Sequence, residues 1–210
     1  MLKFKILIIL VLIGKNSQSQ PAGFQPVRSE TEIAAKLKDY SAKLKSIQSD
    51  FKQEKHLEYL DVALQSGGKF WFETPDKVRW EYNQPYNYIL VLNSGKLKLI
   101  SNKSNNEIDM KGNAVFEQVN NLMVAAVSGN VFDNKDYSVK AYENKDFYLI
   151  NIKPLSNYLS QMIKEMDLYF DKKNYVVTKI KMLESETDYS IITFSNLNID
   201  APIESKVFNP

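Results

Sequence analysis

The residues best suited to chemistry in this chain of 210 residues are three carboxylates in the run "ESETD", namely Glu184, Glu186 and Asp188. Clustered carboxylates can bind calcium, or they can serve as the acid and base of glycoside hydrolysis. The spacing of these three matches neither an EF-hand loop nor a facing pair of carboxylates. We therefore expect a solvated turn at this position.

His56 is the only histidine, and the chain contains no cysteine. A thiol nucleophile is therefore excluded, and a single histidine offers too few ligands for a zinc site. His56 lies in the polar run "FKQEKHLE", which is typical of a strand surface, and no phosphate-binding glycine motif occurs. We expect no cofactor, no metal and no enzyme activity. The alternative is an enzyme whose mechanism uses buried carboxylates.

Aromatic residues alternate with charged ones in "ETPDKVRWEYNQP", residues 73–85. Val78, Trp80 and Tyr82 then share one face of a strand, while Arg79 and Glu81 share the other. The aromatic face is either ordinary core or the lining of a cavity that holds an apolar ligand.

An amphipathic helix of about 18 residues is predicted before these strands. Ser29 and Glu32 form a capping box at its start. The apolar residues at helical spacing are Ile33, Leu37, Tyr40, Leu44 and Ile47.

Alternating patterns separated by turn residues predict about ten antiparallel strands in two series of hairpins. The predicted strands are residues 49–56, 68–73, 77–83, 87–93, 96–101, 136–142, 147–153, 163–171, 175–184 and 188–199. A second helix, residues 113–128, separates the two series, and the final residues 201–210 are expected to form an edge segment or tail. A sheet this large must curl, split or be covered on its apolar face, and the two helices are the candidates for the cover.

The N-terminus has the pattern of a secretory signal peptide. Lys3 and Lys5 precede the apolar run 6–13, which is too short to span a bilayer, and small residues follow at Ser17 and Ser19. A buried helix or a membrane anchor is the alternative. Residues 1–19 contain three lysines and no acidic residue, so their removal would change the net charge from +2 to −1. The charge of the remaining chain therefore does not indicate nucleic-acid binding. We expect residues 20–210 to form one domain that is exported from the cytoplasm.

Together these segments resemble the LolA family, the periplasmic carriers of outer-membrane lipoproteins. The resemblance rests on "IQSDFKQEK", "GGKFWFETPDKVRWEYNQP", "LVLNSGKLKLI", the helix in mid-chain, "LYFDKKNYVVTKI" and the terminal "FNP". It implies a mainly β fold, an incomplete antiparallel barrel of 10–11 strands whose concave apolar face is covered by helices.

The resemblance also implies a cavity that binds the acyl chains of lipoproteins and a helical lid above it. The expected cavity residues are Phe51, Phe70, Phe72, Val78, Trp80, Tyr82, Leu90, Leu97 and Leu99, and the expected lid residues are Val115, Val119, Leu122, Met123 and Ala126. Family members carry an arginine before the first proline of the motif, where it contacts the lid. Thr74 stands at that position here, and Arg79 should face away from the cavity.

The implied partners are acylated lipoproteins as cargo, an inner-membrane transporter that releases them and an outer-membrane acceptor. The protein itself is expected to be a monomer that does not bind nucleic acid. The alternative is a protein with the same fold that carries or senses another amphiphile, such as a glycolipid or a free lipid.

Overall fold

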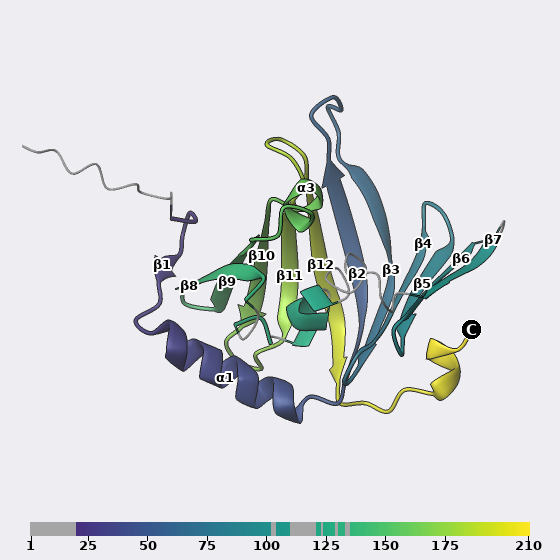
Figure 1. The fold of residues 1–210 in the computed structure, drawn as a ribbon, viewed down its shortest axis with the longest axis horizontal. Coiled ribbons are helices and arrows are strands. Elements are labelled where there is room, and N and C mark those ends of the chain that lie inside the picture. Colours follow the sequence, from purple (N-terminus) through teal and green to yellow (C-terminus); the bar gives the residue numbers. More distant parts are fainter. Residues whose placement is uncertain (1–19, 102–103, 110–120, 123, 129, 133–134) are drawn as a thin grey trace, which may run out of the picture.

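Twelve antiparallel strands form one sheet in the computed structural model (Figure 1). The structure describes residues 20–101, 104–109, 121–122, 124–128, 130–132 and 135–210, so the predicted signal peptide lies outside the described residues. The helices are α1 (Glu30–Lys43), α3 (Leu159–Met162) and the 3-10 helix η1 (Ser205–Phe208). The strands are β1 (Gln25–Pro26), β2 (Ser46–His56), β3 (Leu64–Glu73), β4 (Lys77–Gln84), β5 (Tyr88–Asn93), β6 (Lys96–Ser101), β7 (Ser104–Asp109), β8 (Tyr137–Glu143), β9 (Phe147–Pro154), β10 (Glu165–Asp171), β11 (Val177–Leu183) and β12 (Tyr189–Ile199).

The sheet is an open, barrel-like surface, as the sequence predicted. Its order is β1-β8-β9-β10-β11-β12-β2-β3-β4-β5-β6-β7, so the two hairpin series join where β12 pairs with β2. The described strands leave the sheet unclosed, because β1 pairs only with β8 and β7 pairs only with β6. Where apolar and polar residues alternate, as in β10, the strand has an inner apolar face and an outer polar one.

The strand number was predicted too low, because β1 and β7 were not recognised. β1 has only two residues and belongs to a segment that has the pattern of a loose arm. β7 has the sequence "SNNEID", which lacks an apolar face, and it forms because its backbone pairs with β6. The short helix α3 was also missed.

Helix α1 begins as predicted and ends earlier. The hydroxyl of Ser29 accepts a hydrogen bond from the N–H of Glu32 at 3.2 Å, and Ile33 and Leu37 are buried. The helix ends at Lys43, so Ile47 belongs to β2 and not to the helix. The C-terminal part of the chain fixes this boundary, because Asp200 accepts a hydrogen bond from the N–H of Lys45 at 2.7 Å.

The C-terminal residues form a cover on the outer face, which corrects the prediction of an edge segment or tail. Phe208 of η1 is buried, and Arg79 of β4 donates to the carbonyl oxygen of Val207 at 2.9 Å. Arg79 also binds the carboxylate of Glu81 at 2.6 Å, so this strand has an anchored polar face opposite its aromatic one.

Glycine is required where β3 and β4 come closest together. The register shifts between Gly67 and Gly68, and a Cβ added at Gly68 would lie only 1.8 Å from the carbonyl oxygen of Glu81. At Gly67 the corresponding contact is milder, 2.9 Å from the carbonyl oxygen of Phe51.

We expect Gly68→Ala to lower the free energy of unfolding by about 2–3 kcal/mol, because the backbones of β3 and β4 must separate to admit the methyl group. Gly67→Ala is the matched control and should cost about 1 kcal/mol. Urea denaturation of both variants measures this difference. A loss at Gly68 no larger than that at Gly67 would contradict the close approach.

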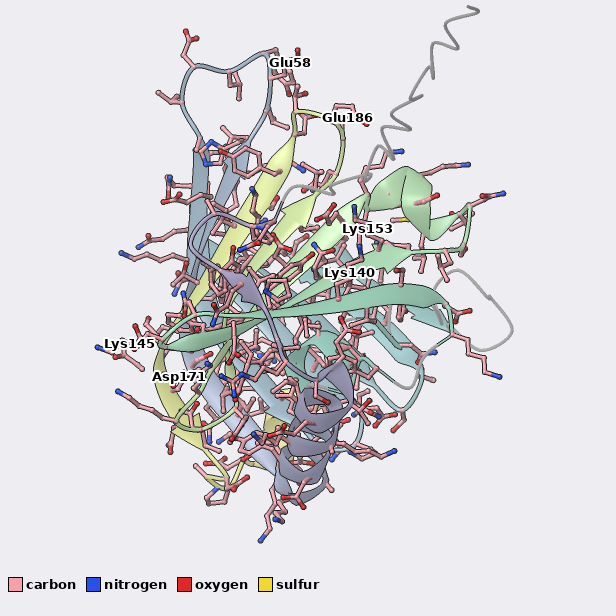
Figure 2. All side chains as sticks on the ribbon, turned by 90° about the vertical axis from the view of Figure 1, so that its left-hand side faces the viewer. Glu58, Lys140, Lys145, Lys153, Asp171 and Glu186 are labelled. Carbon is pink, nitrogen blue, oxygen red and sulfur yellow. The ribbon has the colours of Figure 1, made fainter. Side chains whose placement is uncertain are left out.

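A row of polar residues crosses the outer face of β8, β9 and β10, where Lys140 lies opposite Asn151 and Asn151 opposite Asp167. Figure 2 shows Lys140 and Lys153 on these neighbouring strands. Asn151 donates to Asp167 at 2.6 Å and also to Glu165. Burial raises the pKa of Asp167, and the Glu165 carboxylate adds to this shift against the opposing hydrogen bond from Asn151.

The raised pKa of Asp167 makes the stability depend on pH in a defined direction. The folded protein keeps the proton on Asp167 at pH values where the unfolded chain has lost it, so this group's contribution to stability falls as pH rises above about 4. Asp167→Asn keeps an acceptor for Asn151 and should be more stable than the wild type at pH 7, with little difference at pH 3. Thermal unfolding at both pH values tests this, and an equal shift at the two values would contradict it.

Candidate functional site

The nine residues predicted to line a cavity all lie on one face of the sheet. The register places Phe70 opposite Trp80, Trp80 opposite Leu90, and Leu90 opposite Leu99. A parallel row is formed by Phe72, Val78, Leu92 and Leu97. Phe51 of β2 and Tyr82 of β4 lie on either side of Gly68 in a third row. These rows form a continuous apolar wall over five strands.

Five aromatic rings pack together at the centre of this wall. Trp80 lies 4.5 Å from Phe70, 4.9 Å from Phe51 and 5.7 Å from Phe194, measured between ring centroids. Phe51 reaches Tyr82 at 4.8 Å across the intervening strand. This contact is possible because Gly68, which lies between them in the register, has no side chain.

The exposure of the wall increases toward the β5–β6 hairpin. Trp80 is 7% exposed, Leu90 is half-buried, and Leu99 is 39% exposed. Leu97 is also only half-buried. The row from Trp80 to Leu99 thus connects the buried centre of the wall with solvent through apolar side chains alone.

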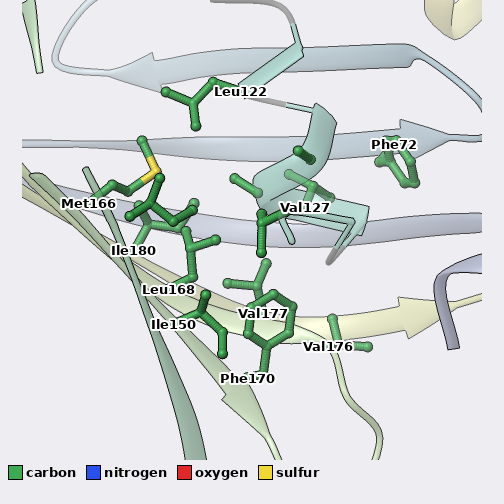
Figure 3. Packing of buried hydrophobic residues seen from close by; sticks show 14 of the residues in the cluster. Phe72, Leu122, Val127, Ile150, Met166, Leu168, Phe170, Val176, Val177 and Ile180 are labelled. Carbon is green, nitrogen blue, oxygen red and sulfur yellow. The ribbon is translucent and has the colours of Figure 1, made fainter. Parts of the chain in front are cut away.

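Helical residues 121–122 and 124–128 lie over the inner face of the sheet (Figures 1 and 3). Leu122 and Ala126, two of the predicted lid residues, are buried in the same apolar cluster as Phe72 and Leu168. Val115, Val119 and Met123, the other three, lie outside the described residues. Helix α1 crosses one end of the strands and adds Ile33 and Leu37 to the cluster (Figure 1).

Sequence reasoning missed the inner residues of the second hairpin series. Ile150, Leu168 and Ile180 lie opposite one another across β9, β10 and β11, and Figure 3 shows them beneath the helical residues. Phe194 of β12 completes the aromatic cluster. The alternation within these strands would have identified all four, because the predicted strands already assigned their faces.

The prediction that Arg79 faces away from the apolar wall is confirmed by its contacts with Glu81 and Val207. Thr74, which replaces the arginine of the family, donates from its N–H and its hydroxyl to the carbonyl oxygen of Lys45 at 3.0 and 3.3 Å. Its contacts therefore hold the connection between α1 and β2.

Polar groups lie at the end of the wall where β2 leads into β3 and β4 into β5. The hydroxyl of Tyr82 donates to the Gln53 side chain at 2.8 Å, and its ring stacks on Tyr88 with centroids 4.2 Å apart. Burial raises the pKa of Tyr82, with the neighbouring Tyr88 as the second cause, so the phenol stays protonated and remains a donor.

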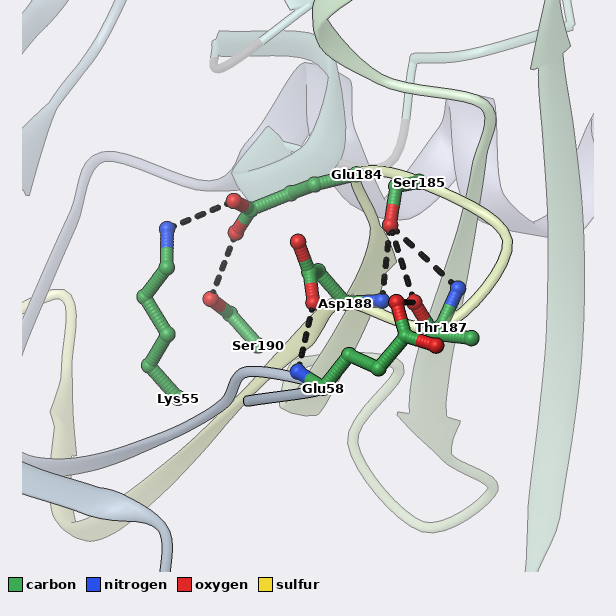
Figure 4. Close-up of polar contacts among 7 residues, drawn as sticks. All are labelled: Lys55, Glu58, Glu184, Ser185, Thr187, Asp188 and Ser190. Carbon is green, nitrogen blue, oxygen red and sulfur yellow. Dashed lines mark hydrogen bonds and ion pairs between the residues drawn. The ribbon is translucent and has the colours of Figure 1, made fainter. Parts of the chain in front are cut away.

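Two of the three carboxylates singled out by their chemistry, Glu184 and Asp188, have structural partners at this same end (Figure 4). Glu184 forms an ion pair with Lys55 at 2.6 Å and accepts a hydrogen bond from Ser190 at 2.7 Å. Asp188 accepts from the N–H of Glu58 at 2.8 Å, which ties the loop after β11 to the loop after β2. Figure 2 shows Glu58 and Glu186 at these neighbouring loops. The segment forms a turn, as the sequence predicted, but Glu184 and Asp188 are half-buried and bonded to protein groups, whereas Glu186 is exposed as a solvated turn requires.

Large exposed apolar side chains lie at this end of the sheet as well. They belong to the β2–β3 connection, the β4–β5 turn and the region of α3, which an antiparallel order places together. The residues are Tyr59, Leu60, Val62, Leu64, Tyr86, Leu155, Tyr158 and Met162. The open end of the wall therefore has an apolar margin.

Groups of metal ligands and membrane-spanning helices are both absent from the described residues. The side chains of histidine, aspartate and glutamate form no group of three that could hold a metal ion there. None of the helices in this part of the chain has the length and apolar character needed to cross a membrane.

An open antiparallel sheet with a helix-covered apolar face is the structural class defined by this geometry. The model of the family "Outer membrane lipoprotein carrier protein LolA" matches residues 42–210, and the chain belongs to the LolA family. The sequence is 32% identical over 94 residues to an outer-membrane lipoprotein carrier protein of Methylococcus capsulatus, a match that covers 45% of this chain and 41% of that protein. A protein with the same description from Alkalilimnicola ehrlichii is 34% identical over 73 residues, 34% of each chain.

These matches span less than half of the length of either relative. Among solved structures, an uncharacterized conserved protein from Thermus thermophilus superposes with a TM-score of 0.50 at 9% identity. The superposition covers 83% of this chain and 92% of that one, and it supports the fold alone.

We expect Leu122→Ala to loosen the helical residues from the wall and to increase the binding of an apolar fluorescent dye severalfold under native conditions. The variant should also lose about 2–5 kcal/mol of stability, as buried leucines do when they are truncated. Dye titration monitored by fluorescence, together with circular dichroism to verify the fold, gives the measurement.

Leu149→Ala is the matched control, because Leu149 is fully buried on the outer face of β9 and leaves the inner wall untouched. It should lose similar stability without gaining dye binding. An equal gain by both variants would show that general loosening, and not uncovering of the wall, admits the dye.

Proposed function

We propose that this protein carries the acyl chains of lipoproteins through the periplasm. It receives them from an inner-membrane transporter and delivers them to an outer-membrane acceptor. Membership in the LolA family and the names of its two relatives support this proposal. Lys3, Lys5 and the apolar run 6–13 support export through a cleaved signal peptide. The role requires binding and release but no covalent step.

The observation that carries the proposal is the continuous apolar row from Trp80 through Leu90 to Leu99, whose exposure rises toward its outer end. An acyl chain of roughly sixteen carbons costs on the order of 12 kcal/mol to hold in water, at about 0.8 kcal/mol per methylene. A soluble carrier must offer an apolar surface of comparable extent. The row gives the chain a path that remains apolar from the exposed Leu99 to the aromatic centre.

Release requires that the site be stable without its ligand. Leu122 and Ala126 cover the wall in the structure, so the acyl chain and the helical residues compete for one surface. Binding then shifts the helical residues away from the wall, and their return favours release. The carrier thereby avoids both an exposed apolar face and irreversible binding.

Trp80→Glu should abolish uptake of lipoprotein, because it places a charge among apolar rings in the path of the acyl chain. Trp71→Glu is the matched control, since Trp71 lies on the outer face of β3, where its ring stacks with Arg79 at 5.5 Å. The assay measures the lipoprotein that each variant releases from spheroplast membranes in a soluble complex. Uptake should remain near the wild-type level for Trp71→Glu.

If Trp80→Glu released lipoprotein as the wild type does, Trp80 would not belong to the acyl-binding site.

Mass spectrometry of the protein purified from periplasm separates the alternatives. Bound lipoprotein supports the proposal, whereas bound glycolipid or free lipid without polypeptide would replace it with a carrier or sensor of another amphiphile.

A further inference from the structure

Two buried hydrogen-bond donors on the apolar wall have no partner among the residues that the structure describes. They are the indole N–H of Trp80 and the hydroxyl of Ser49. Trp80 is only 7% exposed and Ser49 only 8%. Buried polar groups in folded proteins almost always form hydrogen bonds, because an unmade bond destabilises the fold. Two such donors on one surface therefore require an explanation.

Both donors lie on the inner face and in the same row of the register. Ser49 of β2 is opposite Phe70 of β3, and Phe70 is opposite Trp80 of β4. The rings of Phe51, Phe70 and Phe194 surround the indole. None of these rings offers an oxygen acceptor, and a molecule that occupies the wall can supply one.

The surroundings limit the chemistry of that acceptor. Phosphate and carboxylate groups carry a charge, and burying a charge among aromatic rings is costly without a paired cation. The described cations with contacts near this wall are engaged elsewhere, as Lys55 is with Glu184 and Arg79 is on the outer face. A neutral carbonyl oxygen satisfies both donors without this cost.

We propose that Trp80 and Ser49 form a subsite that binds the carbonyl oxygens of acyl linkages in the cargo. This inference rests on the proposed function and adds to it, since it assigns the aromatic centre of the wall to the linkage and the row through Leu90 and Leu99 to the hydrocarbon. Strands β2 and β4 are separated by β3, so the two donors start from backbones roughly 10 Å apart. Because both donors bind carbonyl oxygens, the subsite binds acylated molecules more tightly than plain hydrocarbons of the same length.

A pair of probes that differ only in the carbonyl group tests the subsite. 1-Hexadecanoyl-glycerol contains an ester, and 1-O-hexadecyl-glycerol contains an ether in its place. Displacement of a fluorescent fatty probe measures the affinity of the full protein for each. The wild type should bind the ester about 4- to 100-fold more tightly, because each of the two donors contributes roughly 2- to 10-fold through a hydrogen bond to the carbonyl oxygen that the ether lacks.

Trp80→Phe and Ser49→Ala each remove one donor with little change in shape, and each should reduce the preference for the ester. The double variant should bind the two probes equally. Phe194→Leu is the control without a polar change, and it should weaken both probes by the same factor and keep the preference. Circular dichroism verifies the fold of every variant.

The outcomes separate the two proposals. If the wild type binds both probes equally, or if the variants keep the full preference, the subsite is overturned while the carrier function stands. If the wild type binds neither probe while its fold is intact, the carrier function fails, and the subsite fails with it.

Discussion

This structure depends on one constraint: its large apolar face must stay out of water and yet remain accessible to a ligand. The described sheet does not close on itself, so no opposite wall of strands covers the face permanently. Helical residues 121–128, with the gap at 123, and helix α1 provide the cover. Packing of side chains attaches the helical residues to the sheet, so in the proposed carrier cycle they leave without breaking the hydrogen bonds of the sheet, whereas the wall of a closed barrel cannot. Helix α1 is also tied to the sheet through Glu30, which accepts a hydrogen bond from the N–H of Ala141.

The two halves of the inner apolar face, the wall of the first hairpin series and the inner residues of β9, β10 and β11, meet this constraint in different ways. In the half built from β2, β3 and β4, the rings pack against one another, with Phe51 reaching Tyr82 across Gly68. That half keeps many of its contacts when the cover moves. The half built from β9, β10 and β11 presents aliphatic residues such as Leu168 and Ile180, which depend more on Leu122 and its neighbours for burial. The aromatic half is therefore the part best able to keep its shape during exchange of a ligand.

Local patterns in the sequence were sufficient for most of the fold. The N-cap at Ser29 and the alternation around Trp80 are short-range signals, and both features formed as predicted. The Glu32 side chain, the second half of the predicted capping box, forms an ion pair with Lys36. The signals failed where distant segments decide the outcome. The backbone pairing with β6 forms β7 without an apolar pattern, and the bond from Lys45 to Asp200 ends α1 before Ile47. The inner face was predicted only for the first hairpin series, because the resemblance was most specific there.

The aromatic centre of the wall departs from what a packed core alone would require. Phenylalanine at position 80 and alanine at position 49 would keep the apolar packing and remove two buried donors that lack partners among the described residues. A sequence that specifies one fold usually satisfies such groups, and exceptions are expected where function imposes a second demand. A wall that only had to be filled by its own side chains has no use for an indole N–H or a hydroxyl. A wall that alternates between a helical cover and an acylated ligand gains from them, because they favour the state in which the ligand supplies the missing acceptors.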